Sequence, residues 1–152
     1  MLYFAYASNL FKAQMAVRCR QSVPVRAAVL EGYQLAFVGE SVRWDGGGTA
    51  TIIPKEGASV PGALYELSVT DERSLDRFEG VPTVYDRLEI EIDGEKAYTY
   101  IGRSTDFRPP SERYLDTIRK GYRDWGHPED PLDAIMTLED CGNSEKSRFA
   151  DP

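Results

Sequence analysis

The stretch "YFAYASNL" (residues 3–10) joins an apolar run to the start of a helix without a linker. Residues 2–7 form a short aromatic run that is typical of a strand. Ser8 or Asn9 then supplies an N-cap, and "LFKAQMAVRC" (10–19) places apolar residues at helical spacing. The chain is therefore predicted to open with a strand that passes directly into a helix.

Strand patterns dominate the middle of the chain, with the glycine-rich "WDGGG" (44–48) as a loop between them. The strongest hairpin signal is Asp93-Gly94, which separates "VYDRLEIEI" (84–92) from "KAYTYIG" (96–102). The other predicted strands and turns are, in chain order, strand 25–30, turn Glu31-Gly32, strand 33–39, strand 49–54, turn 55–59 and strand 61–69.

Two further helices are predicted. A short one is capped by Thr70 or Asp71 and ends at Gly80, and a longer one runs from a Ser111 cap to about Trp125. A weaker helical pattern covers 131–141.

Together these elements predict one α+β domain over residues 1–141, built on a compact mixed or barrel-like sheet with helices around it. Residues 142–152 are polar and are expected to form a flexible tail.

Composition excludes several classes of function. The 152 residues are 41% hydrophobic and 28% charged, as in ordinary globular proteins, and the formal net charge of −7 comes without a basic stripe that would bind nucleic acid. No apolar run reaches the roughly 20 residues of a membrane helix. Cys19 and Cys141 lack metal or redox spacing, which favours reduced thiols in a cytoplasmic protein. The only histidine, His127, leaves little material for a metal site or a triad.

Glu79 is the first candidate for chemistry, in "SLDRFEG" (74–80). It lies near an apolar helix face and at the helix end whose dipole disfavours negative charge, and both effects raise the pKa of a carboxyl group. A glutamate tuned in this way can take and give a proton. The alternative is a side chain that simply points into water.

Three other features are ambiguous when each is taken alone. The N–H groups where the first strand meets its helix can bind a carboxylate or an oxyanion, and such a site needs no Arg or Lys. The alternative is an ordinary first strand followed by a capped helix. The "WDGGG" glycines permit close approach of another group, or they only connect strands. Tyrosines 85, 98, 100 and 114 suit a polar pocket, or they only pack across strands.

In chain order, however, these segments resemble the γ-glutamylcyclotransferase-like family. The resemblance covers about residues 3 to 126 and rests above all on "YASNL" (6–10) and the Leu-Asp-x-x-Glu-Gly segment (75–80). It implies a compact barrel-like mixed sheet with a pocket at one end. It also implies that Glu79 is the catalytic glutamate and that no metal or other cofactor is needed. The substrate-binding residues that it implies are Tyr3, Phe4, Ala5, Tyr6, Ala7, Ser8, Asn9, Leu10, Tyr85, Tyr100 and Tyr114.

Two positions depart from the family pattern, and one tyrosine has no counterpart. Ala7 stands where the loop more often has glycine, and "WDGGG" (44–48) is one residue longer than usual. These departures put in doubt any role that needs φ > 0 at residue 7 or a fixed loop length. Tyr98 is expected to be structural.

The resemblance implies an enzyme that converts a small γ-glutamyl substrate to 5-oxoproline and a free amine. The leaving group is left open between an amino acid and an amine. The alternative is a non-catalytic domain that binds a γ-glutamyl ligand. A structural protein is disfavoured because heptads and large apolar stripes are missing. The protein is expected to be a monomer or a homodimer.

Overall fold

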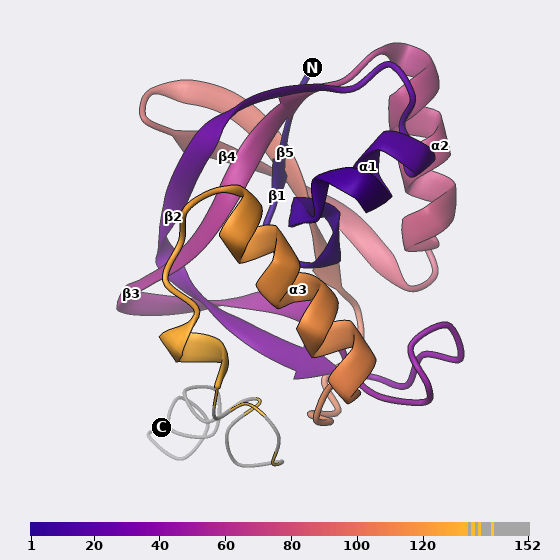
Figure 1. Ribbon diagram of the computed structural model, residues 1–152, viewed down its shortest axis with the longest axis vertical. Helices are drawn as coiled ribbons and strands as arrows, with labels where there is room; N and C mark the ends of the chain where they lie inside the picture. The colour runs from indigo at the N-terminus through magenta and orange to yellow at the C-terminus, as the bar shows by residue number, and fades with distance from the viewer. Residues whose placement is uncertain (134, 136, 138–140, 142–152) are drawn as a thin grey trace.

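The centre of the protein is a mixed five-stranded sheet with the order β2-β3-β1-β5-β4 (Figure 1). The structure is a computed structural model that describes residues 1–133, 135, 137 and 141. The strands are β1 (Leu2–Ala5), β2 (Val23–Val38), β3 (Thr49–Glu66), β4 (Tyr85–Ile92) and β5 (Glu95–Gly102). Strand β1 pairs in parallel with β5, and all other pairs are antiparallel. The sheet ends at β2 and β4, so the predicted mixed α+β architecture is confirmed, but the sheet is open rather than a closed barrel.

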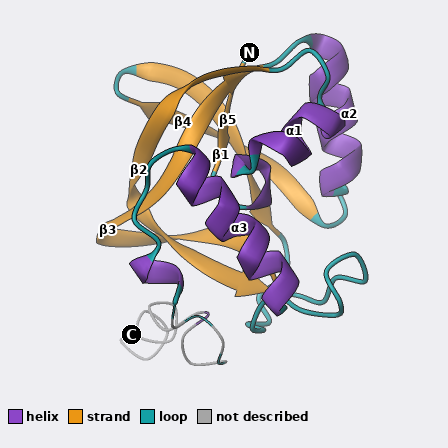
Figure 2. Ribbon diagram, in the orientation of Figure 1, coloured by secondary structure: helices purple, strands orange, loops and turns teal. Residues whose placement is uncertain are grey.

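Within the residues that the structure describes, three helices accompany the sheet. They are α1 (Lys12–Arg18), α2 (Val69–Glu79) and α3 (Glu112–Asp124), with short 3₁₀ turns η1 (Ser8–Leu10) and η2 (Asp130–Leu132). Helices α1 and α2 lie side by side, and α3 packs against η1 (Figure 2). None of the helices in the described part of the chain is long and apolar enough to cross a membrane.

The two long strands correct the predicted turns. Residues 23–38 form one strand, because the chain continues through Gly32 (φ 84°) instead of reversing there. The ladder pairs Glu31 with Ser59 and then Tyr33 with Pro54, so 55–58 are also taken up inside β3. Such extra residues bend a strand locally but do not reverse it.

The start of α2 differs from the prediction, whereas its end is as predicted. Ser68, not Thr70 or Asp71, caps α2, and its hydroxyl accepts from the N–H of Asp71. The predicted end of α2 at Gly80 is confirmed, with Gly80 in the left-handed conformation (φ 69°) that suits a helix terminus.

Two other local predictions are confirmed. Asp93 and Gly94 both have positive φ, as in the favoured two-residue hairpin turn. The Ser111 cap of α3 is also as predicted.

One core cluster holds the sheet and helices together, and it continues into the N-terminal junction. Gly121 of α3 lies against that junction so closely that a Cβ there would be 2.4 Å from the Cβ of Leu10. Of the weak helical pattern at 131–141, η2 covers the start. Much of the rest of it, and the tail 142–152, lie outside the described residues.

Candidate active site

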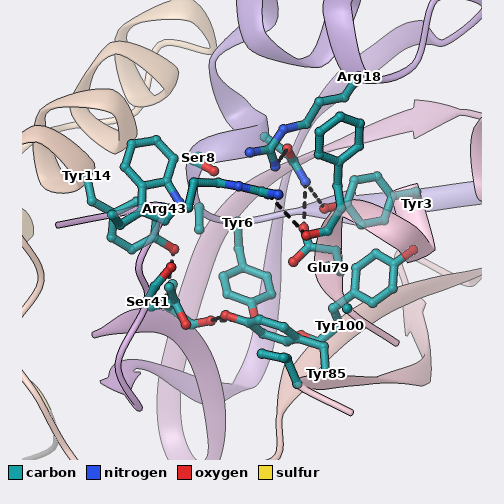
Figure 3. A pocket seen from close by; sticks show the side chains of 18 residues that line it. Tyr3, Tyr6, Ser8, Arg18, Ser41, Arg43, Glu79, Tyr85, Tyr100 and Tyr114 are labelled. Atoms are coloured by element: carbon teal, nitrogen blue, oxygen red, sulfur yellow. Dashed lines mark hydrogen bonds between the residues drawn. The ribbon is translucent and has the colours of Figure 1, made fainter. Parts of the chain in front are cut away.

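A cavity of about 220 Å³ opens between three segments: the β1–α1 junction, the C-terminal end of α2, and residues 39–48, which join β2 to β3 and are called the glycine loop below (Figure 3). Its walls combine tyrosines, two arginines and a single carboxylate side chain among the described lining residues. The lining residues are Tyr3, Tyr6, Ala7, Ser8, Asn9, Arg18, Ser41, Arg43, Trp44, Thr49, Ala50, Phe78, Glu79, Gly80, Val84, Tyr85, Tyr100 and Tyr114.

Glu79 contributes the carboxylate. As the last residue of α2 it precedes the reversal at Gly80, and its side chain lies in the pocket wall (Figure 3). Burial raises the pKa of this carboxyl group, although the charge of Arg18 and a hydrogen bond from Asn9 oppose the rise. The carboxylate is therefore held closer to neutrality than an ordinary surface glutamate.

Asn9 orients that carboxylate. Its Nδ2 donates to Glu79 Oε1 (3.0 Å) and to the Tyr3 hydroxyl (2.9 Å). Its Oδ1 accepts from Arg18 Nη1 (3.0 Å) and Gln14 Nε2 (3.2 Å). Because both ends of the amide are engaged, the donor end is fixed toward Glu79.

Three tyrosine hydroxyls meet the backbone of Ala50 at the start of β3. Tyr114 Oη accepts from the Ala50 N–H (2.9 Å), and Tyr85 Oη donates to the Ala50 carbonyl (2.5 Å). Tyr6 Oη donates to the carbonyl of Tyr100 (2.6 Å) and more weakly to that of Ala50 (3.5 Å). Burial raises the pKa of all three hydroxyls, so they act as neutral hydrogen-bonding groups.

Tyr100 and Tyr98 lie to one side of this group. The Tyr100 hydroxyl donates to Asp76 Oδ1 (2.6 Å), so its ring lines the pocket while its polar end is already engaged. Tyr98 is buried against Tyr3 and Tyr100 and is absent from the described pocket lining, as expected for a structural residue.

The structure brings most of the predicted site residues to this one cavity, but not all of them. Phe4, Ala5 and Leu10 are fully buried in the core and do not line it. Their side chains belong to the core cluster, while Ala7, Ser8 and Asn9 line the cavity. Ala7 has φ −130°, so this position does not require the left-handed conformation that favours glycine.

Sequence reasoning missed the two arginines of the pocket. Arg18 comes from the last residue of α1, and Arg43 comes from the glycine loop. Their guanidinium carbons lie 4.9 and 5.3 Å from the ring centroid of Phe78. The available signal was their position beside predicted pocket segments, since no local basic cluster marks them.

The glycine loop is held in place by close backbone contacts. A Cβ at Gly48 would lie 2.1 Å from the carbonyl oxygen of Arg108, and one at Gly47 would lie 2.5 Å from the N–H nitrogen of Ser111. The loop also carries Trp44, which is buried against Tyr114 with ring centroids 4.7 Å apart. Glycine is therefore required here for close approach, and the loop supplies a pocket wall as well as connecting strands.

Comparison with known proteins identifies the family of this chain. The family model described as "Gamma-glutamyl cyclotransferase, AIG2-like" matches residues 3–125. The chain belongs to this family. Two curated relatives are both named "Gamma-glutamylcyclotransferase". The mouse protein is 30% identical over 99% of this chain and 84% of its own length, and the Bos taurus protein is 31% identical over 91% and 78%.

A solved structure named "Gamma-glutamyl cyclotransferase" is similar in fold and in sequence. It superposes with a TM-score of 0.83 and 29% identity, covering 89% of this chain and 87% of that one. The matched region 3–125 contains Glu79, Asn9 and both pocket arginines. The region matched by the family model therefore includes all the residues that line the cavity.

Proposed function

We propose that this protein catalyses the cyclisation of a γ-glutamyl amide to 5-oxoproline, with release of the amine or amino acid that was attached. The α-amine of the substrate attacks its own γ-carbonyl carbon and forms a C–N bond that closes a lactam. The original amide C–N bond then breaks. Counted from the substrate's α-ammonium group, two protons leave the attacking nitrogen and two reach the departing nitrogen, which is released as an ammonium group, so no redox partner and no added water are consumed.

Glu79 is proposed as the group that carries the proton. Its pKa is raised by burial, so the ionised form can take a proton from the substrate ammonium and the neutral form can return it to the leaving nitrogen. Oε1 is held by Asn9, which leaves Oε2 as the oxygen proposed to face the substrate. This position of Glu79, beside the β1–α1 junction in a member of this family, is the observation that carries the proposal.

The junction is proposed to hold the glutamyl part. Residues Ala7 to Asn9 enter the turn η1, and the first N–H groups of a helical turn have no partner within it. Such donors can bind a carboxylate or stabilise the oxyanion that forms at the γ-carbonyl. The neutral hydroxyls around Ala50 complete the polar lining, and a folded substrate held there gains from proximity.

The test is incubation of the purified protein with γ-glutamyl-amino acids and γ-glutamylamines, with 5-oxoproline measured. Glu79→Gln should retain the fold and lose product formation, whereas Glu72→Gln on the same helix, outside the pocket, should retain activity. A Glu79→Gln variant that keeps most of its turnover would refute the proton-carrying role. Binding of γ-glutamyl compounds by the wild type without 5-oxoproline would favour a binding domain instead.

We further propose a cytoplasmic location. The Cys19 thiol is buried and donates to the carbonyl of Asp71 (3.5 Å), which suits a reducing compartment. Oxidised Cys19 in protein isolated under non-reducing conditions would argue against that location.

A further inference from the structure

Arg43 is the more exposed of the two arginines in the pocket wall. Its side chain extends from the glycine loop toward Glu79 (Figure 3). Nη1 donates to the backbone carbonyl of Phe78 at 3.2 Å, and Phe78 directly precedes Glu79 in the chain. The guanidinium therefore binds the backbone of the residue that precedes the proposed proton carrier.

The chemistry of the reaction fixes what can lie at that place. Glu79 must reach the leaving nitrogen in order to protonate it. In a γ-glutamyl-α-amino acid, the carbon bonded to that nitrogen also carries a carboxylate, which must then lie close to Glu79 as well. A γ-glutamylamine has no charge there. A guanidinium carries five N–H donors in a fork that matches a carboxylate, and the contact with Phe78 engages Nη1.

The charges around the pocket support the same assignment. The chain carries a formal net charge of −7, yet Arg18 and Arg43 both line this cavity. Arg18 is engaged with the side chain of Asn9 and has a role in orienting Glu79. Arg43 reaches instead a backbone carbonyl on the solvent side of the site, and its charge is available to a substrate anion.

We propose that Arg43 selects the leaving group by binding its α-carboxylate, so that γ-glutamyl-α-amino acids are preferred over γ-glutamylamines. This inference rests on the proposed function. The charge of Arg43 also opposes the rise in the pKa of Glu79, but this effect is the same for both kinds of substrate, so the preference between them reports the contact with the leaving group.

A matched pair of substrates isolates the effect: γ-glutamyl-L-alanine and γ-glutamylethylamine differ only in the carboxylate. The quantity to measure is the ratio of their kcat/KM values, from 5-oxoproline release. Arg43→Gln should lower this ratio about tenfold, as expected for the loss of a charge-assisted hydrogen bond at a partly solvated position. Arg43→Lys should keep part of the preference. Arg20→Gln, the same charge change at an exposed residue outside the pocket, should leave the ratio unchanged.

Three results would overturn the inference. A wild-type enzyme that uses both substrates equally would show that the carboxylate is not recognised. An equal loss on both substrates in Arg43→Gln would show that Arg43 acts on Glu79 or on the glutamyl part and not on the leaving group, with the proposed function intact because 5-oxoproline still forms. Absence of 5-oxoproline from both substrates in the wild type would refute the proposed function itself.

Discussion

Replacement of Asn9 by alanine should destabilise the fold and remove the contact between the β1–α1 junction and Glu79. The change removes four hydrogen bonds, each with a net contribution of about 1 kcal/mol. Glu79, Arg18 and Gln14 are partly exposed and can turn to water, whereas Tyr3 is only 4% exposed. We therefore expect a loss of about 2–4 kcal/mol in the free energy of unfolding.

A double-mutant cycle with Tyr3→Phe resolves the buried contact. In the wild type, loss of the Tyr3 hydroxyl should cost about 1 kcal/mol, because its bond to Asn9 is lost. In the Asn9→Ala background the same change should cost about nothing, which gives a coupling energy of about 1 kcal/mol. Tyr85→Phe is the matched control, since that hydroxyl bonds to Ala50 and its cost should be the same in both backgrounds.

Urea denaturation followed by tryptophan fluorescence measures all of these free energies. If Tyr3→Phe costs the same with and without Asn9, the two groups are independent and the proposed orientation of the Asn9 amide is wrong.

Two further predictions concern Glu79 and the contact between α3 and η1. Glu79→Gln should be more stable than the wild type at pH 8, with the difference shrinking as the pH falls toward 4. The pKa of Glu79 is raised in the folded state by burial, so the carboxyl group favours folding when protonated and loses that contribution as the pH rises. Denaturation midpoints over this pH range check it, and a constant difference would contradict the raised pKa. Gly121→Ala should cost about 1–3 kcal/mol despite the better helix propensity of alanine, because the new Cβ would lie 2.4 Å from that of Leu10. Thermal denaturation measures this cost, and a more stable variant would show that α3 can move away from η1 easily.

Local signals predicted those parts of the site that depend on local conformation. The end of α2 at Gly80 follows from the left-handed preference of glycine, and it places Glu79 at the pocket. The Asp93-Gly94 hairpin likewise follows from two positions with positive φ. In both cases the positive φ of the position favours the residue type that occupies it.

The features that the sequence analysis predicted wrongly or missed depend on contacts with residues far away in the chain. Gly32 has the signature of a turn, but β2 pairs with β3 on both sides of it, so the strand continues and the extra residues 55–58 are accommodated in β3. Arg18 and Arg43 are ordinary surface arginines by local pattern, and only the packing of α1 and the glycine loop around Phe78 brings them to the pocket. The open edge of the sheet was also beyond local patterns, because closure is a property of all the strands together.

The close contacts of Gly47 and Gly48 with residues 108–111 fix one end of the glycine loop, and hydrogen bonds of the Ser41 backbone to Trp44, Gly46 and Gly47 hold its turn. The two glycines are fixed by neighbouring backbone, so substitution there would displace the wall that carries Trp44. Residues 41–43 precede this anchor and include Val42, which is 96% exposed. Side-chain changes at the exposed positions 42 and 43 should therefore alter which substrates are accepted without disturbing the backbone of the loop. Evolution of new specificities in this scaffold, and their engineering, should concentrate on those two side chains.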